Sequence, residues 1–117
     1  MKRYLGQKKV ARIYIDSADT FEGKPLWQHL VQEAKADGLA GATVFKGVAG
    51  MGAHSEVHTF EIWALAQKLP VVIEIIEEEE KLMAFLARCD GAIAEGLITL
   101  SDVEVIAYKH SKFAKEQ

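Results

Sequence analysis

The sequence holds a single cysteine, no long apolar run and no excess of positive charge, and each shortage excludes a class of protein. Cys89 cannot form a disulfide within the chain, which fits a reducing compartment. The longest apolar run, LPVVIEII, is interrupted by Glu74 and falls well short of the roughly 20 residues that span a bilayer. The N-terminal stretch MKRYLGQKKVARIYI lacks the apolar segment of a signal peptide. We therefore expect a cytoplasmic protein.

The charge of the chain argues against nucleic acid as a partner. The formal net charge is −3, and the acidic residues are spread along the chain. Proteins that bind nucleic acid gather lysine and arginine on one face, where these side chains neutralise phosphates. The sequence has no such basic stripe, so we expect no nucleic-acid partner.

Hydrophobic periodicity predicts alternating strands and helices. The stretch 10–15 alternates and is rich in β-branched residues, as in a half-buried strand. The stretches 42–48 and 70–77 also predict strands, and 70–77 is the strongest of them. Apolar residues recur at helical spacing between Pro25 and Gly38, a glycine that stands where a helix would end, and again over 78–96. The stretches LITL and VEVIAYKH predict one or two closing strands around a turn at Ser101–Asp102, and TFEIWALAQKL (59–69) favours a short helix over a strand.

This order predicts an α+β, ferredoxin-like (βαββαβ) fold, with a four-stranded antiparallel sheet, two helices on one face and a long loop after the second strand. We expect one domain over residues 1–117, with its core in 10–108 and a flexible tail at 111–117. No repeat or low-complexity stretch suggests a second domain.

The second face of such a sheet has no helices to cover it. The alternation places Ala11, Ile13 and Ile15 on one face of the first strand and Val10, Arg12 and Tyr14 on the other. We expect the uncovered face to carry Arg12, Tyr14, Thr43, Phe45, and either Glu74 or its neighbours Val71, Ile73 and Ile75. Such an apolar face predicts a homo-oligomer. Arg12 among these side chains needs a partner, and we expect Glu74 to be that partner.

Few residues support catalysis or metal binding. His54 and His58 are four apart, a spacing that lets two imidazoles share a metal on a helix, but HSEVH is not the HExxH of zinc peptidases. Ser55 lacks a GxSxG elbow, and burial of Cys89 on a helix would raise its pKa rather than activate the thiol. The acidic run Glu77–Glu80 is typical of a solvated helix start. We therefore expect no enzyme.

The segment TVFKGVAGMGAH (43–54) runs from a strand into three glycines. Glycine lets backbone N–H groups turn toward an anion and lets a ligand approach closely. Taken alone, the segment predicts either a phosphate cradle or a mobile loop with no ligand. The basic groups that could meet a phosphate are Arg12, Lys24, Lys46, Lys109 and His110.

Five blocks in order, RIYI, FEGKPLW, GLAGATVFKGVAGMG, LPVVIEI and GLITLSDVEVI, resemble domain-of-unknown-function family 190, a group of PII-like signalling proteins. The resemblance covers residues 10 to about 108. It implies a homotrimer that binds AMP, ADP or ATP between protomers, with no required cofactor, and a T-loop at 47–59 that engages a partner. The resemblance makes Thr43, Gly50 and Gly52 nucleotide contacts and places Lys24 and Lys46 near the phosphates. Arg12 and Gly47 complete the predicted nucleotide-binding residues.

The chain departs from true PII proteins in one block. The glycine-lysine turn that closes over phosphates in those proteins is replaced here by LITLSDVEV. Members of family 190 also lie near, or are fused to, membrane proteins resembling fluoride exporters, which implies a membrane-transporter partner. The expected function is a non-enzymatic, nucleotide-responsive regulator. The alternative is a metal-responsive trimer resembling the copper-tolerance proteins, with His54 and His58 as ligands.

Overall fold

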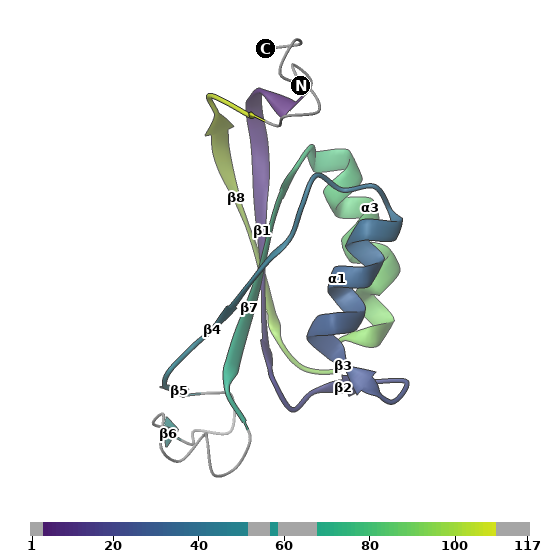
Figure 1. Ribbon diagram of the computed structural model, residues 1–117, viewed down its shortest axis with the longest axis vertical. Helices are drawn as coiled ribbons and strands as arrows, with labels where there is room; N and C mark the ends of the chain where they lie inside the picture. Colours follow the sequence, from purple (N-terminus) through teal and green to yellow (C-terminus); the bar gives the residue numbers. More distant parts are fainter. Residues whose placement is uncertain (1–3, 52–56, 59–67, 110–117) are drawn as a thin grey trace.

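The structure is a computed structural model that describes residues 4–51, 57–58 and 68–109. A four-stranded antiparallel sheet with strand order β4-β7-β1-β8 is packed against two helices, α1 and α3, which lie side by side on one face (Figure 1). The bounds are β1 Gly6–Asp16, α1 Leu26–Ala36, β4 Thr43–Lys46, β7 Pro70–Glu77, α3 Glu79–Cys89 and β8 Leu97–Val105. The predicted ferredoxin-like order is confirmed.

Two short hairpins and a 3₁₀ turn accompany these elements. β2 (Thr20–Phe21) pairs with β3 (Lys24–Pro25) immediately before α1, and β5 (Gly50–Met51) pairs with β6 (Val57–His58) after β4. A 3₁₀ turn, Asp90–Ala92, follows α3. The first hairpin turns through Glu22 and Gly23, both with positive φ, as a two-residue hairpin turn requires.

The core forms between the sheet and the helices because one face of each strand is apolar. It holds alternate residues of the two central strands and one stripe of each helix, namely Ala11, Ile13, Ile15, Val71, Ile73, Ile75, Leu26, Leu30, Ala34, Leu82, Phe85 and Cys89. Val71, Ile73 and Ile75 therefore face the helices, and Glu74 lies on the uncovered face. This settles the alternative that the sequence left open for β7.

The ends of several elements differ from the predicted ones. β1 begins at Gly6 rather than at residue 10, and α3 ends at Cys89, although a helix was expected to residue 96. α1 ends as expected, because Gly38 has a φ of 74° and its N–H donates to the Lys35 carbonyl over 3.0 Å. The predicted helix at 59–69 and the predicted tail at 111–117 lie mainly or wholly outside the described residues.

The predicted turn at Ser101–Asp102 is wrong. β8 runs through both positions, where Ser101 pairs with Val10 and Asp102 pairs with Lys9. The Lys9 ammonium also forms an ion pair with the Asp102 carboxylate. Serine and aspartate favour turns locally, but nine paired residues of a strand, Leu97–Val105, outweigh that preference here.

Neither helix within the described ranges is long and apolar enough to cross a membrane.

Candidate ligand site on the open face of the sheet

The face of the sheet opposite the helices, here called the open face, carries a polar row across all four strands. Thr43 pairs with Glu74, Glu74 with Arg12, and Arg12 with Thr99. Paired residues point to the same side of a sheet, so these four side chains share the open face. Arg12 Nε donates to Glu74 Oε2 over 3.0 Å, which confirms the predicted pair. Apolar side chains flank the row, among them the exposed Tyr14, Phe45 and Ile76.

A pocket of about 400 Å³ opens beside this row. Its lining residues come from the end of the sheet where β1 begins and β8 ends, and Figure 1 shows these two ends side by side. The walls of the pocket are largely apolar, with a few polar groups that could orient a ligand. The lining residues are Tyr4, Lys8, Ala40, Gly41, Ala42, Thr43, Glu74, Ile76, Val105, Ala107 and Tyr108. Pockets for small organic ligands have this combination of apolar walls and few polar groups.

One wall comes from two segments that are far apart in the sequence. β1 and β8 pair from Gly6 with Val105 onward, so the residues beyond this pair, Tyr4 and Tyr108, come together. Their ring centroids are 5.2 Å apart and the rings are tilted by 40°. Lys8, which also lines the pocket, donates from Nζ to the Leu5 carbonyl over 3.2 Å. This wall offers aromatic surface and one cation.

The opposite wall is the connection between α1 and β4, residues 40–43. It is fixed by a carboxylate at the end of β7, since the Ala40 N–H donates to Glu77 Oε2 over 2.9 Å. Glu77 Oε1 accepts the Glu78 N–H over 3.1 Å, and the Glu77 side chain is fully buried. The expectation of a solvated helix start is therefore wrong for Glu77. Its position continues the inward alternation of Val71, Ile73 and Ile75 along the strand.

Of the residues predicted to bind nucleotide, Thr43 lines the pocket and Arg12 is bonded to Glu74, which also lines it. The structure does not bring the others to this pocket. Lys24 lies on β3 and donates to Gln32 over 3.2 Å. Lys46 pairs with Val71, so it lies on the helix-facing side of β4, opposite to Thr43. Gly52 is outside the described residues.

Gly47 and Gly50 lie beyond the far end of β4. The Gly47 N–H donates to the Pro70 carbonyl over 2.7 Å, and a Cβ at Gly47 would clash with the Pro70 ring. This close approach gives Gly47 a packing reason to be glycine. Gly50 pairs with His58 in the β5–β6 hairpin. The roles of Gly47, Gly50 and Gly52 toward a nucleotide stay predictions.

The metal alternative gains no support from the described ranges, which hold no group of three or more metal-ligating side chains. Of its two proposed ligands, His58 lies in β6 and His54 is outside the described residues. Metal binding by this pair also stays a prediction.

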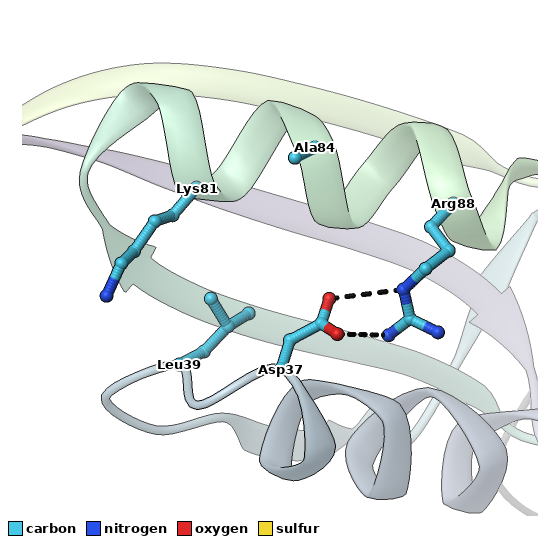
Figure 2. A pocket seen from close by; sticks show the side chains of 5 residues that line it. All are labelled: Asp37, Leu39, Lys81, Ala84 and Arg88. Atoms are coloured by element: carbon cyan, nitrogen blue, oxygen red, sulfur yellow. Dashed lines mark hydrogen bonds and ion pairs between the residues drawn. The ribbon is translucent and has the colours of Figure 1, made fainter.

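A second hollow, of about 340 Å³, lies between the end of α1 and α3 (Figure 2). Its basic groups are Lys81 and Arg88, but Figure 2 shows Arg88 bound to Asp37, with Nη2–Oδ1 at 2.7 Å and Nε–Oδ2 at 3.3 Å. Arg88 also donates to Glu33 Oε2 over 3.2 Å. Because two carboxylates already neutralise this guanidinium, the hollow suits an anionic ligand less well than its arginine suggests.

Thr43 is the one lining residue that sequence reasoning assigned to the ligand. The residues that it missed include Tyr4, Lys8 and Tyr108, and Glu74 was expected only as a structural partner. Gly41 stands two residues before Thr43, in a block that carried the family resemblance but was not itself linked to the ligand. Tyr4 and Tyr108 could have been found if the first strand had been predicted to start earlier. Antiparallel pairing of that strand with the last one would then bring the two ends of the chain together.

Solved structures with a similar fold include PII-like proteins. A structure of CPII from Thiomonas intermedia K12, bound to ADP and bicarbonate, matches with a TM-score of 0.64 and 17% identity over 86% of this chain and 90% of that one. A putative PII-like signaling protein from Thermus thermophilus matches with a TM-score of 0.57 and 22% identity over 87% of this chain and 91% of that one. The chain therefore has a PII-like fold.

Relatives in sequence are closer. A UPF0166 protein of Aquifex aeolicus is 48% identical over 86% of this chain and 94% of its own length. A UPF0166 protein of Methanocaldococcus jannaschii is 37% identical over 83% of this chain and 90% of its own length. The model of domain-of-unknown-function family 190, described as an uncharacterized ACR, matches residues 8–105. The chain belongs to this family.

Proposed function

We propose that this chain is a PII-like regulatory protein that binds an adenine nucleotide in the pocket beside Thr43 and Glu74. The observation that carries the proposal is this pocket of about 400 Å³ on a PII-like fold. Similar folds supply the ligand class, because CPII has been solved with ADP and with AMP. AMP, ADP and ATP are the candidate ligands.

The chemistry of the pocket suits the base and sugar of a nucleotide. Apolar walls and the Tyr4–Tyr108 pair offer surface against which a purine can pack. The Thr43 hydroxyl can donate or accept a hydrogen bond, and the Glu74 carboxylate can accept one from an exocyclic amine. A carboxylate repels phosphate, so the phosphates point away from Glu74 and toward basic groups such as Lys8.

The open face supports assembly with other copies of the chain, which we propose to be a homotrimer. Tyr14 and Phe45 are 39% and 50% exposed in the single chain, and both lie on this face. A cleft between two copies would also let Lys24, Lys46 and the glycines at 47, 50 and 52 of one chain reach a nucleotide seated on Thr43 of another. This arrangement explains how residues on opposite sides of β4 can serve one ligand.

Binding is proposed to act as a signal without turnover of the nucleotide. The segment 47–59 is the T-loop of this proposal, and its partner is a membrane transporter, as the resemblance to family 190 implies. A nucleotide can bias such a loop only if it binds the two loop conformations with different affinity. Backbone N–H groups that meet a phosphate in one conformation would supply this difference.

Equilibrium titration of nucleotide-stripped protein with AMP, ADP, ATP and cyclic AMP tests the proposal. We expect saturable binding near one nucleotide per chain, recovery of intact ATP and a light-scattering mass of three chains. Absence of binding for all four nucleotides, in protein whose circular dichroism shows an intact fold, would overturn the proposed function. The rank order of affinity would identify the nucleotide that is sensed.

A further inference from the structure

The buried carboxylate of Glu77 lies behind the candidate pocket and takes no part in the proposed ligand contacts. We infer that Glu77 is a positioning residue, which holds the 40–43 wall of the pocket in place for the nucleotide. The inference rests on the proposed function, because it concerns how the same pocket is kept in its binding shape. Glu77 itself does not line the pocket.

The contacts of Glu77 join three elements. Its backbone ends β7, its Oε1 accepts the Glu78 N–H that opens α3, and its Oε2 accepts the Ala40 N–H from the α1–β4 connection. Charged acceptors form shorter and stronger hydrogen bonds than neutral ones. Glu77 therefore ties the pocket wall to β7, one of the two central strands of the sheet.

The place of Glu77 in the core indicates a role beyond filling space. It continues the inward series Val71, Ile73 and Ile75, all of which are fully buried, as Glu77 is. An aliphatic residue would complete this series without burying a charge, and well-packed apolar residues usually match or exceed buried charges in stability. Of these four side chains, only the Glu77 carboxylate can accept hydrogen bonds from the Ala40 and Glu78 N–H groups. These two hydrogen bonds explain why a carboxylate stands at this position.

The wall needs such an anchor because of its place between two elements. α1 ends at Ala36, its last turn is closed by the Gly38 and Leu39 N–H groups, and the β4–β7 ladder begins only at Thr43. Residues 40–42 cross this interval, and all three line the pocket. The bond from Ala40 fixes one end of the crossing, so its loss would let the wall shift relative to Glu74 and Ile76.

The variant Glu77→Gln tests this inference. Glutamine keeps the size of the side chain but has an NH₂ donor in place of one of the two oxygens. It therefore cannot offer a separate acceptor to each N–H group, as Glu77 does. We expect the Ala40 amide to exchange with solvent about tenfold faster than in wild type, and the dissociation constant for ADP to rise about tenfold. Hydrogen exchange followed by NMR and calorimetric titration measure the two effects. If Glu77→Gln does not fold, Glu77→Asp, whose shorter carboxylate cannot span both groups, replaces it with the same expected result.

Ile75→Val is the matched control. It removes one methylene from a fully buried residue of the same strand and leaves the pocket lining and Glu77 unchanged. We expect it to lower stability but to keep the wild-type affinity for ADP. If Glu77→Gln bound ADP as tightly as wild type, or if Ile75→Val lost as much affinity for ADP as Glu77→Gln, the inference about Glu77 would be overturned and the proposed function would not. Absence of ADP binding by the wild-type protein would instead overturn the proposed function.

Discussion

The Arg12 guanidinium donates from Nε to Glu74 Oε2 over 3.0 Å, across two neighbouring strands of the open face. The pair links the centre of the sheet to the pocket, because Glu74 also forms part of the pocket wall. Both side chains remain partly exposed in the single chain, at 39% for Arg12 and 26% for Glu74. Solvent therefore screens their attraction, and the pair orients Glu74 more than it stabilises the fold.

A double-mutant cycle measures this pair. With Arg12→Met and Glu74→Gln, we expect a coupling free energy of about 0.5 kcal/mol in urea unfolding, as for other partly exposed ion pairs. The control cycle combines Arg12→Met with Glu80→Gln, an exposed residue of α3, and its two changes in unfolding free energy should add. Additivity in the Arg12–Glu74 cycle would contradict the account of the polar row.

Thr43→Val tests the hydroxyl that faces the pocket. Valine keeps the branched shape and suits a strand, so we expect the free energy of unfolding to change by less than about 0.5 kcal/mol. Loss of one hydrogen bond to the ligand should weaken nucleotide binding about tenfold. Thr99→Val is the matched control, since Thr99 lies in the same row on β8 and does not line the pocket. Calorimetric titration measures the affinity of both variants for the nucleotide. Equal affinities of Thr43→Val and Thr99→Val would show that Thr43 does not contact the ligand.

Gly47→Ala tests the packing reason for the first glycine after β4. A Cβ there would clash with the Pro70 ring, so we expect a loss of about 1–3 kcal/mol in the free energy of unfolding. At Gly91 a Cβ meets nothing within 4 Å, and Gly91→Ala should change stability by less than about 0.5 kcal/mol. Urea unfolding compares the two. Equal stability of both variants would mean that the chain can move away from Pro70 at no cost.

Because its thiol is buried, Cys89 should make the free energy of unfolding depend on pH in alkaline solution. Burial raises the pKa of its thiol, which is only 3% exposed. Above about pH 8.5 an exposed thiol loses its proton, so the unfolded chain then binds fewer protons than the folded one, and stability falls as the pH rises. Below that pH the thiol is protonated in both states and contributes no slope. Urea unfolding at several pH values should show a shallower alkaline decline for Cys89→Ala. If the free energy of unfolding fell equally steeply with pH in wild type and in Cys89→Ala, the account of Cys89 would be contradicted.

The sheet could be predicted from the sequence because its strands are rich in β-branched residues. The sequence did not show which side of β7 faces the helices, because Val72 and Ile76 are as apolar as Val71, Ile73 and Ile75. Glu74 was expected beside Arg12 because of its charge, and the register confirms that they pair. The turn at Ser101–Asp102 was predicted wrongly because local preference was weighed without the pairing partner. Lys9 and Val10 supply that partner. Lys9 lies before the predicted strand 10–15, and Val10 is the first residue of that strand.

The pocket was harder to predict because its walls meet only in the folded chain. Thr43 was found through the family resemblance, but Tyr4 and Tyr108 stand 104 positions apart and depend on the register of β1 with β8. Glu77 was misjudged since four successive acidic residues look like a solvated helix start. The available signal was its spacing, because Glu77 follows Ile73 and Ile75 at intervals of two residues. In a strand this spacing places the Glu77 side chain on the same, inward side.

The most direct test of the central proposal is to record amide NMR spectra of the ¹⁵N-labelled protein while ADP is added. A nucleotide in the pocket beside Thr43 and Glu74 should shift three groups of amides most strongly, those of residues 40–43, 74–76 and 105–108. Amides of the other hollow, around Lys81 and Arg88 (Figure 2), should move little. Saturable shifts centred on the three groups would support the proposed site, and no shifts, or shifts confined to Lys81 and Arg88, would contradict it.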